Sequence, residues 1–168
     1  MCPGGLCQSL PCLLYSWRKD LKHYRVVINS KEKDSGVVKA LENQDLEIEI
    51  ATLESGDYIV NRRIAFKRLT VNDILKSIFK GEKLFSAMGN MTKVYECRIL
   101  IIEGEDPFFP GRPVNLSFIQ SFLKTIAVSF GVSTLFTLNE AQTAEVISSI
   151  ARAEHLNKPG PSRIQKIQ

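Results

Sequence analysis

The chain has 168 residues, a net charge of +4 and 44% hydrophobic residues, which fits one globular domain of ordinary size. This composition excludes a wholly disordered or fibrous chain, and no apolar run approaches the ~20 residues that a membrane span needs. We predict an N-terminal tail over residues 1–21, one domain over residues 22–156 and a disordered basic tail over residues 157–168.

Apolar periodicity, β-branched runs and turn residues predict alternating strands and helices along the chain. The predicted strands are 24–28, 46–51, 58–60, 64–66, 94–103 and 132–138. The predicted helices are 35–44, 71–80, 83–93, 115–130 and 139–155. Residues 61–63 are predicted to form a hairpin turn, and Thr70 with Asp73 has the spacing of a capping box. This order of elements predicts an α/β domain with a mixed sheet.

Cys2, Cys7 and Cys12 crowd the start of the chain, whereas Cys97 lies far away in an apolar run. A zinc site needs a fourth ligand, and none is near these three residues in the sequence. We therefore predict reduced thiols and no metal at this end of the chain.

Charged residues are segregated along the sequence. Residues 38–57 contain six acids and one lysine, whereas residues 58–83 contain seven bases and two acids. A basic stretch of this kind suggests a polyanion, most simply nucleic acid, and the alternative is an ordinary solvated face. The predicted DNA-binding residues are Lys31, Arg62, Arg63, Lys67, Arg68, Lys80 and Lys83.

Five motifs follow one another between residues 24 and 156. They are Val27-Ile-Asn29 with Lys31-Glu32, Gly56-Asp57, Ala65-Phe-Lys-Arg-Leu-Thr-Val-Asn-Asp73, Gly81-Glu-Lys-Leu-Phe85 and Leu100-Ile-Ile-Glu-Gly104. In order and spacing they resemble the nuclease domain of XPF-type structure-specific DNA endonucleases. The resemblance implies a restriction-endonuclease-like α/β domain, with a mixed central sheet flanked by helices. The start of the chain lacks the charged region of a signal peptide, which predicts an intracellular protein, in the cytoplasm or nucleoid, or in a nucleus.

The resemblance also implies where a nuclease centre would lie. In that family three acids hold a divalent cation, and a lysine orients the attacking water. Here the first acid is replaced by Asn29, the third acid by Lys67 and the lysine by Leu69, while Asp57 is retained. Because Mg²⁺ requires hard oxygen ligands, we predict no catalytic residue, no metal and no cofactor. The degenerate site consists of Asn29, Asp57, Lys67, Arg68, Leu69 and Asp73.

Several side-chain roles stay open at this point. Lys67 either pairs with Asp57 in place of the cation or points to solvent. Arg68 either contacts a phosphate or braces an acid such as Asp73. Glu32 and Glu103 are expected to be solvated residues at strand ends.

The predicted function is a non-catalytic module of DNA repair or recombination that binds branched DNA through its phosphates. It would dimerise with a second copy or with a related nuclease subunit, and it would not bind a membrane. One alternative is a weak Mg²⁺-dependent endonuclease that uses Asp57 with a substitute acid such as Glu32. Another alternative is a protein-interaction scaffold that does not bind DNA. The predicted dimer interface consists of Phe118, Phe122, Ile126 and Ile147.

Overall fold

The structure is a computed structural model that describes residues 24–80, 82–104 and 116–156. The two predicted tails, the three cysteines near the start and Gly81 as the end of a helix lie outside the described residues. Within the described ranges, the helices are all too short or too polar to cross a membrane.

One six-stranded sheet forms the middle of the molecule, in the order β2-β1-β3-β4-β5-β6. Strand β3 runs antiparallel to both of its neighbours, and the other neighbouring pairs are parallel. The predicted mixed sheet is therefore confirmed. The strands are β1 (Arg25–Asn29), β2 (Glu47–Ala51), β3 (Tyr58–Val60), β4 (Ile64–Thr70), β5 (Cys97–Glu103) and β6 (Ser133–Thr137).

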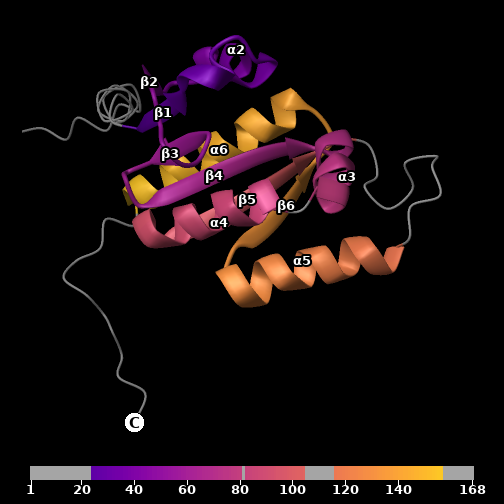
Figure 1. The fold of residues 1–168 in the computed structure, drawn as a ribbon. Coiled ribbons are helices and arrows are strands. Elements are labelled where there is room, and N and C mark those ends of the chain that lie inside the picture. Colours follow the sequence, from indigo (N-terminus) through magenta and orange to yellow (C-terminus); the bar gives the residue numbers. More distant parts are fainter. Residues whose placement is uncertain (1–23, 81, 105–115, 157–168) are drawn as a thin grey trace, which may run out of the picture.

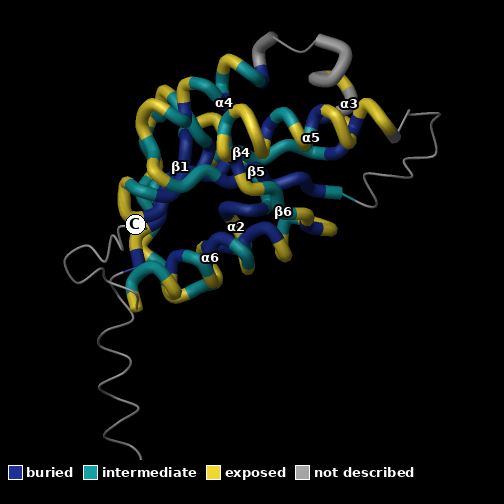
Figure 2. The backbone as a smooth tube through the Cα atoms, turned by 90° about the horizontal axis from the view of Figure 1, so that it is seen from below, coloured by how far each residue is buried: buried dark blue, intermediate teal, exposed yellow. Residues whose placement is uncertain are grey.

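Helices cover both faces of this sheet. In Figure 1, α2 and α6 lie above the sheet, whereas α4 and α5 lie below it. Figure 2 shows the same layers from another direction, with buried strands between helices whose outer residues are exposed. The helices are η2 (Ser30–Glu32), α2 (Gly36–Glu42), α3 (Val71–Lys80), α4 (Glu82–Val94), α5 (Leu116–Phe130) and α6 (Glu140–Leu156).

Each strand sends alternate side chains into two separate cores. In β4, Phe66 packs in the core beneath α2 and α6, whereas Ala65 packs in the core with α3, α4 and α5. In β3, Tyr58 and Ile59 divide between the two cores in the same way. Consecutive residues of a strand therefore contribute to different faces of the molecule.

Three local signals that predict element boundaries are confirmed, but two strand bounds are wrong: β4 extends to Thr70 instead of residue 66, and β5 begins at Cys97 because Val94 still belongs to α4. Asn61 and Arg62 both have positive φ, as a tight hairpin between β3 and β4 requires. The Thr70 hydroxyl accepts a hydrogen bond from Asp73 N and donates one to the Asp73 carboxylate, as predicted for a capping box at the start of α3. The Asn139 side chain caps α6 by accepting a hydrogen bond from Gln142 N.

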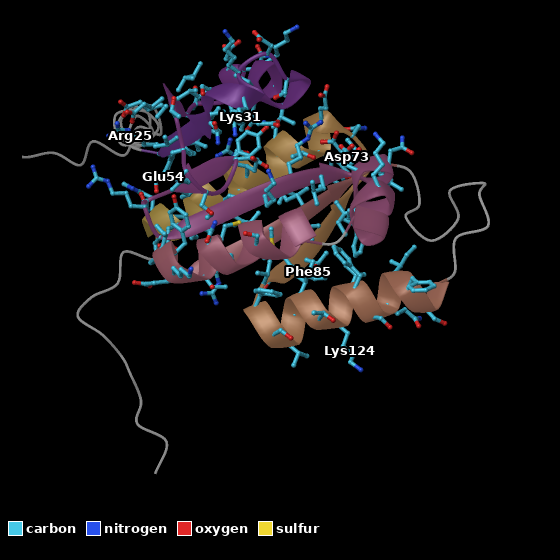
Figure 3. All side chains as sticks on the ribbon, in the orientation of Figure 1. Arg25, Lys31, Glu54, Asp73, Phe85 and Lys124 are labelled. Atoms are coloured by element: carbon cyan, nitrogen blue, oxygen red, sulfur yellow. The ribbon has the colours of Figure 1, made fainter. Side chains whose placement is uncertain are left out.

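The predicted dimer interface is wrong for three of its four residues. Phe122, Ile126 and Ile147 are buried in the two cores of a single chain, whereas Phe118 is 61% exposed. Figure 3 shows Phe85 between α4 and α5, where its ring lies 5.7 Å from that of Phe122. Helices α3, α4 and α5 share one face of the sheet, and the buried apolar residues of α5 pack against the other two helices and the sheet.

Candidate functional site

The candidate site lies where β1 ends and β3 begins. Asn29 is the last residue of β1, and its backbone N donates to the Asp57 carbonyl oxygen at 2.8 Å. Asp57 in turn donates its backbone N–H to the Phe66 carbonyl oxygen at 2.7 Å, which fixes it beside β4. Gly56 precedes it with φ +84°, a conformation that a residue without Cβ adopts easily.

Asn29, Asp57 and Lys67 form what we call the Asp57 cluster. The Lys67 ammonium donates to Asp57 Oδ1 at 2.8 Å, and the Arg68 backbone N donates to Asp57 Oδ2 at 2.9 Å. The Asp57 side chain is only 6% exposed, whereas that of Lys67 is 26% exposed. The pairing of Lys67 with Asp57 is therefore confirmed, and the alternative in which Lys67 points to solvent without a partner is excluded.

Asn29 is buried, and its side-chain amide forms hydrogen bonds with backbone groups. The side-chain Nδ2 donates to the carbonyl oxygens of Leu53 and Gly56 at 3.2 and 3.1 Å. Oδ1 accepts from the Lys31 backbone N at 3.3 Å. A carboxylate in this place would point an acceptor at two carbonyl oxygens, so the amide belongs to the structure of the loop before β3.

The Asp57 cluster does not fit the divalent cation that the resemblance implies. Mg²⁺ prefers carboxylate and water oxygens, whereas here an ammonium occupies one oxygen of the retained acid and an N–H the other. In the part of the chain that the structure describes, no three His, Cys, Asp or Glu side chains are arranged to hold a metal ion. The residues present are those of an ion pair.

Arg68 lies on the opposite face of the sheet and contacts three carboxylates; these four residues are the Arg68 cluster. Its guanidinium donates to both Glu103 oxygens at 2.9 and 2.5 Å and to Glu32 and Glu140 at 3.2 Å each. The Arg68 side chain is 13% exposed. The hydrogen bonds that Arg68 donates to Glu103 outweigh the opposing effect of burial and raise the pKa of Arg68. The alternative in which Arg68 braces an acid is confirmed, but its partners are Glu32, Glu103 and Glu140 and not Asp73.

The expectation that Glu32 and Glu103 are solvated is wrong. Burial alone would raise the pKa of Glu103, yet hydrogen bonds from Arg68 and Thr143 lower it overall. Thr143 donates to Glu103 at 2.6 Å, and the Tyr58 hydroxyl donates to Glu32 at 3.0 Å. Burial also raises the pKa of Tyr58, so its hydroxyl keeps its proton. These carboxylates are internal parts of the fold.

Sequence reasoning missed two residues that contact the buried charges around Arg68. Tyr58 donates to Glu32, and Glu140 accepts from Arg68. Glu140 accepts the backbone N–H of Gly36 at 3.1 Å and so joins the start of α6 to the start of α2. Its position directly after the helix cap Asn139 was a signal for the helix boundary, but not for a contact 104 residues away. Tyr58 gave no signal other than its place in an apolar strand.

The predicted DNA-binding residues whose side chains the structure describes do not gather on one surface. Arg63 donates to both Glu154 oxygens at 2.8 and 2.6 Å, so its guanidinium joins the hairpin to α6. Arg62 lies at the far end of β3 and lines a cavity of about 610 Å³ together with Arg25. Lys31 is exposed directly after Asn29 and Ser30, near the Asp57 cluster. The side chains of Lys80 and Lys83 lie outside the described residues.

The remaining motif residue, Asp73, has a structural role. Its carboxylate accepts the Thr70 hydroxyl at 2.7 Å and the Lys76 ammonium at 3.4 Å, and the hydrogen bond from Thr70 is the main cause of its lowered pKa. Figure 3 shows Asp73 in the first turn of α3. Leu69 is half-buried and packs against the core of α3, α4 and α5.

Comparison with known proteins connects this arrangement to a family. Residues 28–150 match the family model of the ERCC4 domain. The chain is 33% identical over 137 residues to a Methanocaldococcus jannaschii protein named as an ATP-dependent RNA helicase, a match that covers 82% of this chain and 16% of that protein. It is 24% identical over 140 residues to the 3'-flap repair endonuclease Xpf of Saccharolobus solfataricus, a match that covers 83% of this chain and 60% of the relative.

A solved structure is similar as well. XPF from Aeropyrum pernix, in complex with DNA, matches with a TM-score of 0.73 and 28% identity, over 84% of this chain and 68% of that one. The chain therefore spans less than two thirds of both sequence relatives and about two thirds of this structural relative.

Proposed function

The chain belongs to the ERCC4 domain family and is an XPF-type nuclease domain, and we propose that it binds DNA in repair or recombination without cleaving it. The observation that carries this proposal is the ion pair between Lys67 and Asp57 at 2.8 Å. Metal-assisted phosphodiester cleavage needs a cation that stabilises charge on the phosphate and lowers the pKa of water. An ammonium cannot generate a hydroxide in that way.

DNA binding is supported by the relatives and by the exposed cations beside the cluster. The Aeropyrum pernix XPF structure is a complex with DNA, and the Saccharolobus solfataricus relative is named as a flap repair endonuclease. Among the described residues near the end of β1, Lys31 and Lys33 are exposed, and the Lys67 side chain is 26% exposed. Contacts of this kind go to phosphates, so binding should be indifferent to sequence and strongly dependent on salt. The protein would act where DNA is, inside the cell.

The proposal includes a second subunit, either another copy or a related nuclease chain. Strand β6 is an edge of the sheet, and edges with exposed apolar residues favour pairing with another chain. Large apolar side chains are exposed on β6, directly after it, and on α5. They are Phe118, Val128, Phe136 and Leu138. We expect the Val128→Ser and Phe136→Ser double variant to lower the mass measured by light scattering if the chain self-associates.

The two alternative functions have less support. A weak endonuclease that combines Asp57 with Glu32 would need both acids on one side of a phosphate. Glu32 instead binds Arg68 and Tyr58 on the other face of the sheet. The other alternative is a scaffold that never binds DNA, and a measurement of DNA binding is enough to distinguish it from the proposed function.

The test uses labelled flap and forked DNA in two assays. We expect no cleavage above background in Mg²⁺ or Mn²⁺, together with a salt-sensitive mobility shift in EDTA. Cleavage that disappears in Asp57→Ala would overturn the proposal, because a retained acid would then support metal chemistry. A complete lack of binding to either DNA at low salt would favour the scaffold.

A further inference from the structure

We propose that Lys67 is a built-in substitute for the divalent cation, and that its ammonium binds a backbone phosphate of DNA without any metal. This inference rests on the proposed function, since it names the contact through which the domain binds DNA. It predicts a phosphate-binding site that works in EDTA. It arises from the disagreement between the residues of the Asp57 cluster and the ligands that a metal requires.

The Lys67 side chain stays partly accessible to solvent above the buried Asp57 carboxylate. Asp57 is buried beneath it at 6% exposure, whereas Lys67 keeps 26% of its side chain exposed. An ammonium carries three N–H donors. Within the described residues, one of them is used, in the 2.8 Å bond to Asp57 Oδ1. The other two can serve an oxygen that approaches from solvent.

The other members of the cluster have no such capacity. Asn29 uses its amide hydrogens on Leu53 and Gly56, and Asp57 Oδ2 accepts the Arg68 backbone N–H. A ligand at this place therefore meets one charged donor and no unpaired acid. An anion is the ligand that suits that environment, and a metal cation is the ligand it repels.

The rigidity of the pair supports a binding role. Lys67 lies in the interior of β4, where it pairs with Leu100 of β5 and directly follows Phe66, the last residue of β4 that pairs with β3, so its backbone is held by the sheet. Asp57 holds the ammonium in one position through a charge-assisted hydrogen bond. A lysine held in this way loses less side-chain entropy on binding a phosphate than a free surface lysine does. Lys31, exposed near the end of β1, adds a second positive charge.

The experiment compares three variants by fluorescence anisotropy of a fluorescein-labelled flap duplex, with EDTA or Mg²⁺ at equal ionic strength. Lys67→Met should weaken binding about 5- to 10-fold and reduce the slope of log Kd against log salt by about one. Asp57→Asn should tighten binding several-fold, because it removes the negative charge of the counterion while the amide oxygen can still accept the hydrogen bond that positions the Lys67 ammonium. Lys124→Met is the control, since Lys124 is exposed on α5 and Figure 3 shows it pointing away from the molecule.

The wild-type protein should bind equally well in EDTA and in Mg²⁺. Two results would overturn the inference while leaving the proposed function intact: binding by wild type that Lys67→Met does not change, or binding that requires Mg²⁺. If Lys67→Met fails to fold, Asp57→Asn decides, because weaker binding by that variant contradicts a contact through the Lys67 ammonium. No binding by wild type at low salt in either buffer would contradict the proposed function itself.

Discussion

Lys67 and Arg68 are neighbours in β4, yet they serve two regions with different electrostatic character. Lys67 belongs to the Asp57 cluster, where one ammonium faces one buried carboxylate and part of the lysine side chain is exposed to solvent. Arg68 belongs to the Arg68 cluster, where one guanidinium faces three carboxylates and is 13% exposed. Alternation of side chains along a strand is the cause of the division. The first region can still accept a ligand, whereas the donors of the second already have protein partners.

The comparison shows that a basic stretch of sequence is not the same as a basic surface. Arg63 and Arg68 supply two of the seven bases between residues 58 and 83, and both are bound to glutamates from distant parts of the chain. These arginines join elements of the fold. A buried arginine with several carboxylates is also a place where the loss of one partner is costly.

The largest effect should come from breaking the Arg68 cluster. Arg68→Met leaves Glu103, 8% exposed, without its cation, and we expect a loss of ~3–5 kcal/mol in the free energy of unfolding. Urea unfolding monitored by circular dichroism measures it. The matched control is Lys76→Met, which breaks an exposed pair with Asp73 and should cost about 0–0.5 kcal/mol. Equal effects of the two substitutions would show that burial of the carboxylates does not matter.

The second prediction restores an acid in the Asp57 cluster. Asn29→Asp replaces two N–H donors to Leu53 and Gly56 by a carboxylate oxygen, so we expect a loss of ~2–3 kcal/mol at neutral pH. Thermal unfolding with and without Mg²⁺ tests it, and Asn29→Ala is the control that removes the donors without adding a charge. If Asn29→Asp is as stable as wild type in EDTA, the amide does not hold the loop.

The third prediction uses pH to isolate the contribution of the Arg68 cluster to stability. The folded-state pKa of Glu103 lies below its ordinary value of 4.5, so this group stabilises the fold above about pH 4.5 and ceases to do so as the pH falls through the folded pKa. The unfolding free energy of wild type should therefore fall on acidification in that window. In Glu103→Gln this part of the pH dependence is missing, whereas the part due to Asp73, whose pKa is also lowered, remains. Parallel pH profiles for the two proteins would contradict the assignment.

Much of the fold could be predicted from the sequence, because its signals are local. The cap at Thr70, the turn at 61–63 and the alternation in the strands all depend on residues a few positions apart. The family resemblance added the sheet, and the match over residues 28–150 confirms it. For the Asp57 cluster, the family resemblance included Asn29, Asp57 and Lys67 among six predicted site residues, and pairing of Lys67 with Asp57 was one of two alternatives.

The Arg68 cluster could not be predicted in the same way. Its contacts join residues 35, 36 and 72 positions apart, from η2, β4, β5 and α6, and no short spacing reports them. Carboxylates at strand ends are usually solvated, so Glu32 and Glu103 gave a misleading signal. The apolar residues of α5 led to a wrong dimer interface for a related reason. The sequence alone does not show that α3 and α4 cover the same face of the sheet as α5 and pack against it.

The smallest predicted effect concerns the cap between β4 and α3. This cap lies outside both clusters, so its loss gives a reference value for the free energy of unfolding against which the cluster variants can be compared. Thr70→Ala removes the hydroxyl that accepts Asp73 N–H at 3.2 Å and donates to the Asp73 carboxylate at 2.7 Å. We expect a loss of about 1 kcal/mol in the free energy of unfolding, because the cap satisfies one backbone donor at a partly exposed helix end. Thr70→Ser keeps the hydroxyl and should recover most of that loss in the same urea titration. Since the hydrogen bond from Thr70 is the main cause of the lowered pKa of Asp73, the Ala variant should also bring that pKa closer to its ordinary value of 3.8, as measured by NMR titration. A loss as large as that of Arg68→Met would mean that the start of α3 is coupled to the Arg68 cluster, and the two regions could no longer be treated as independent.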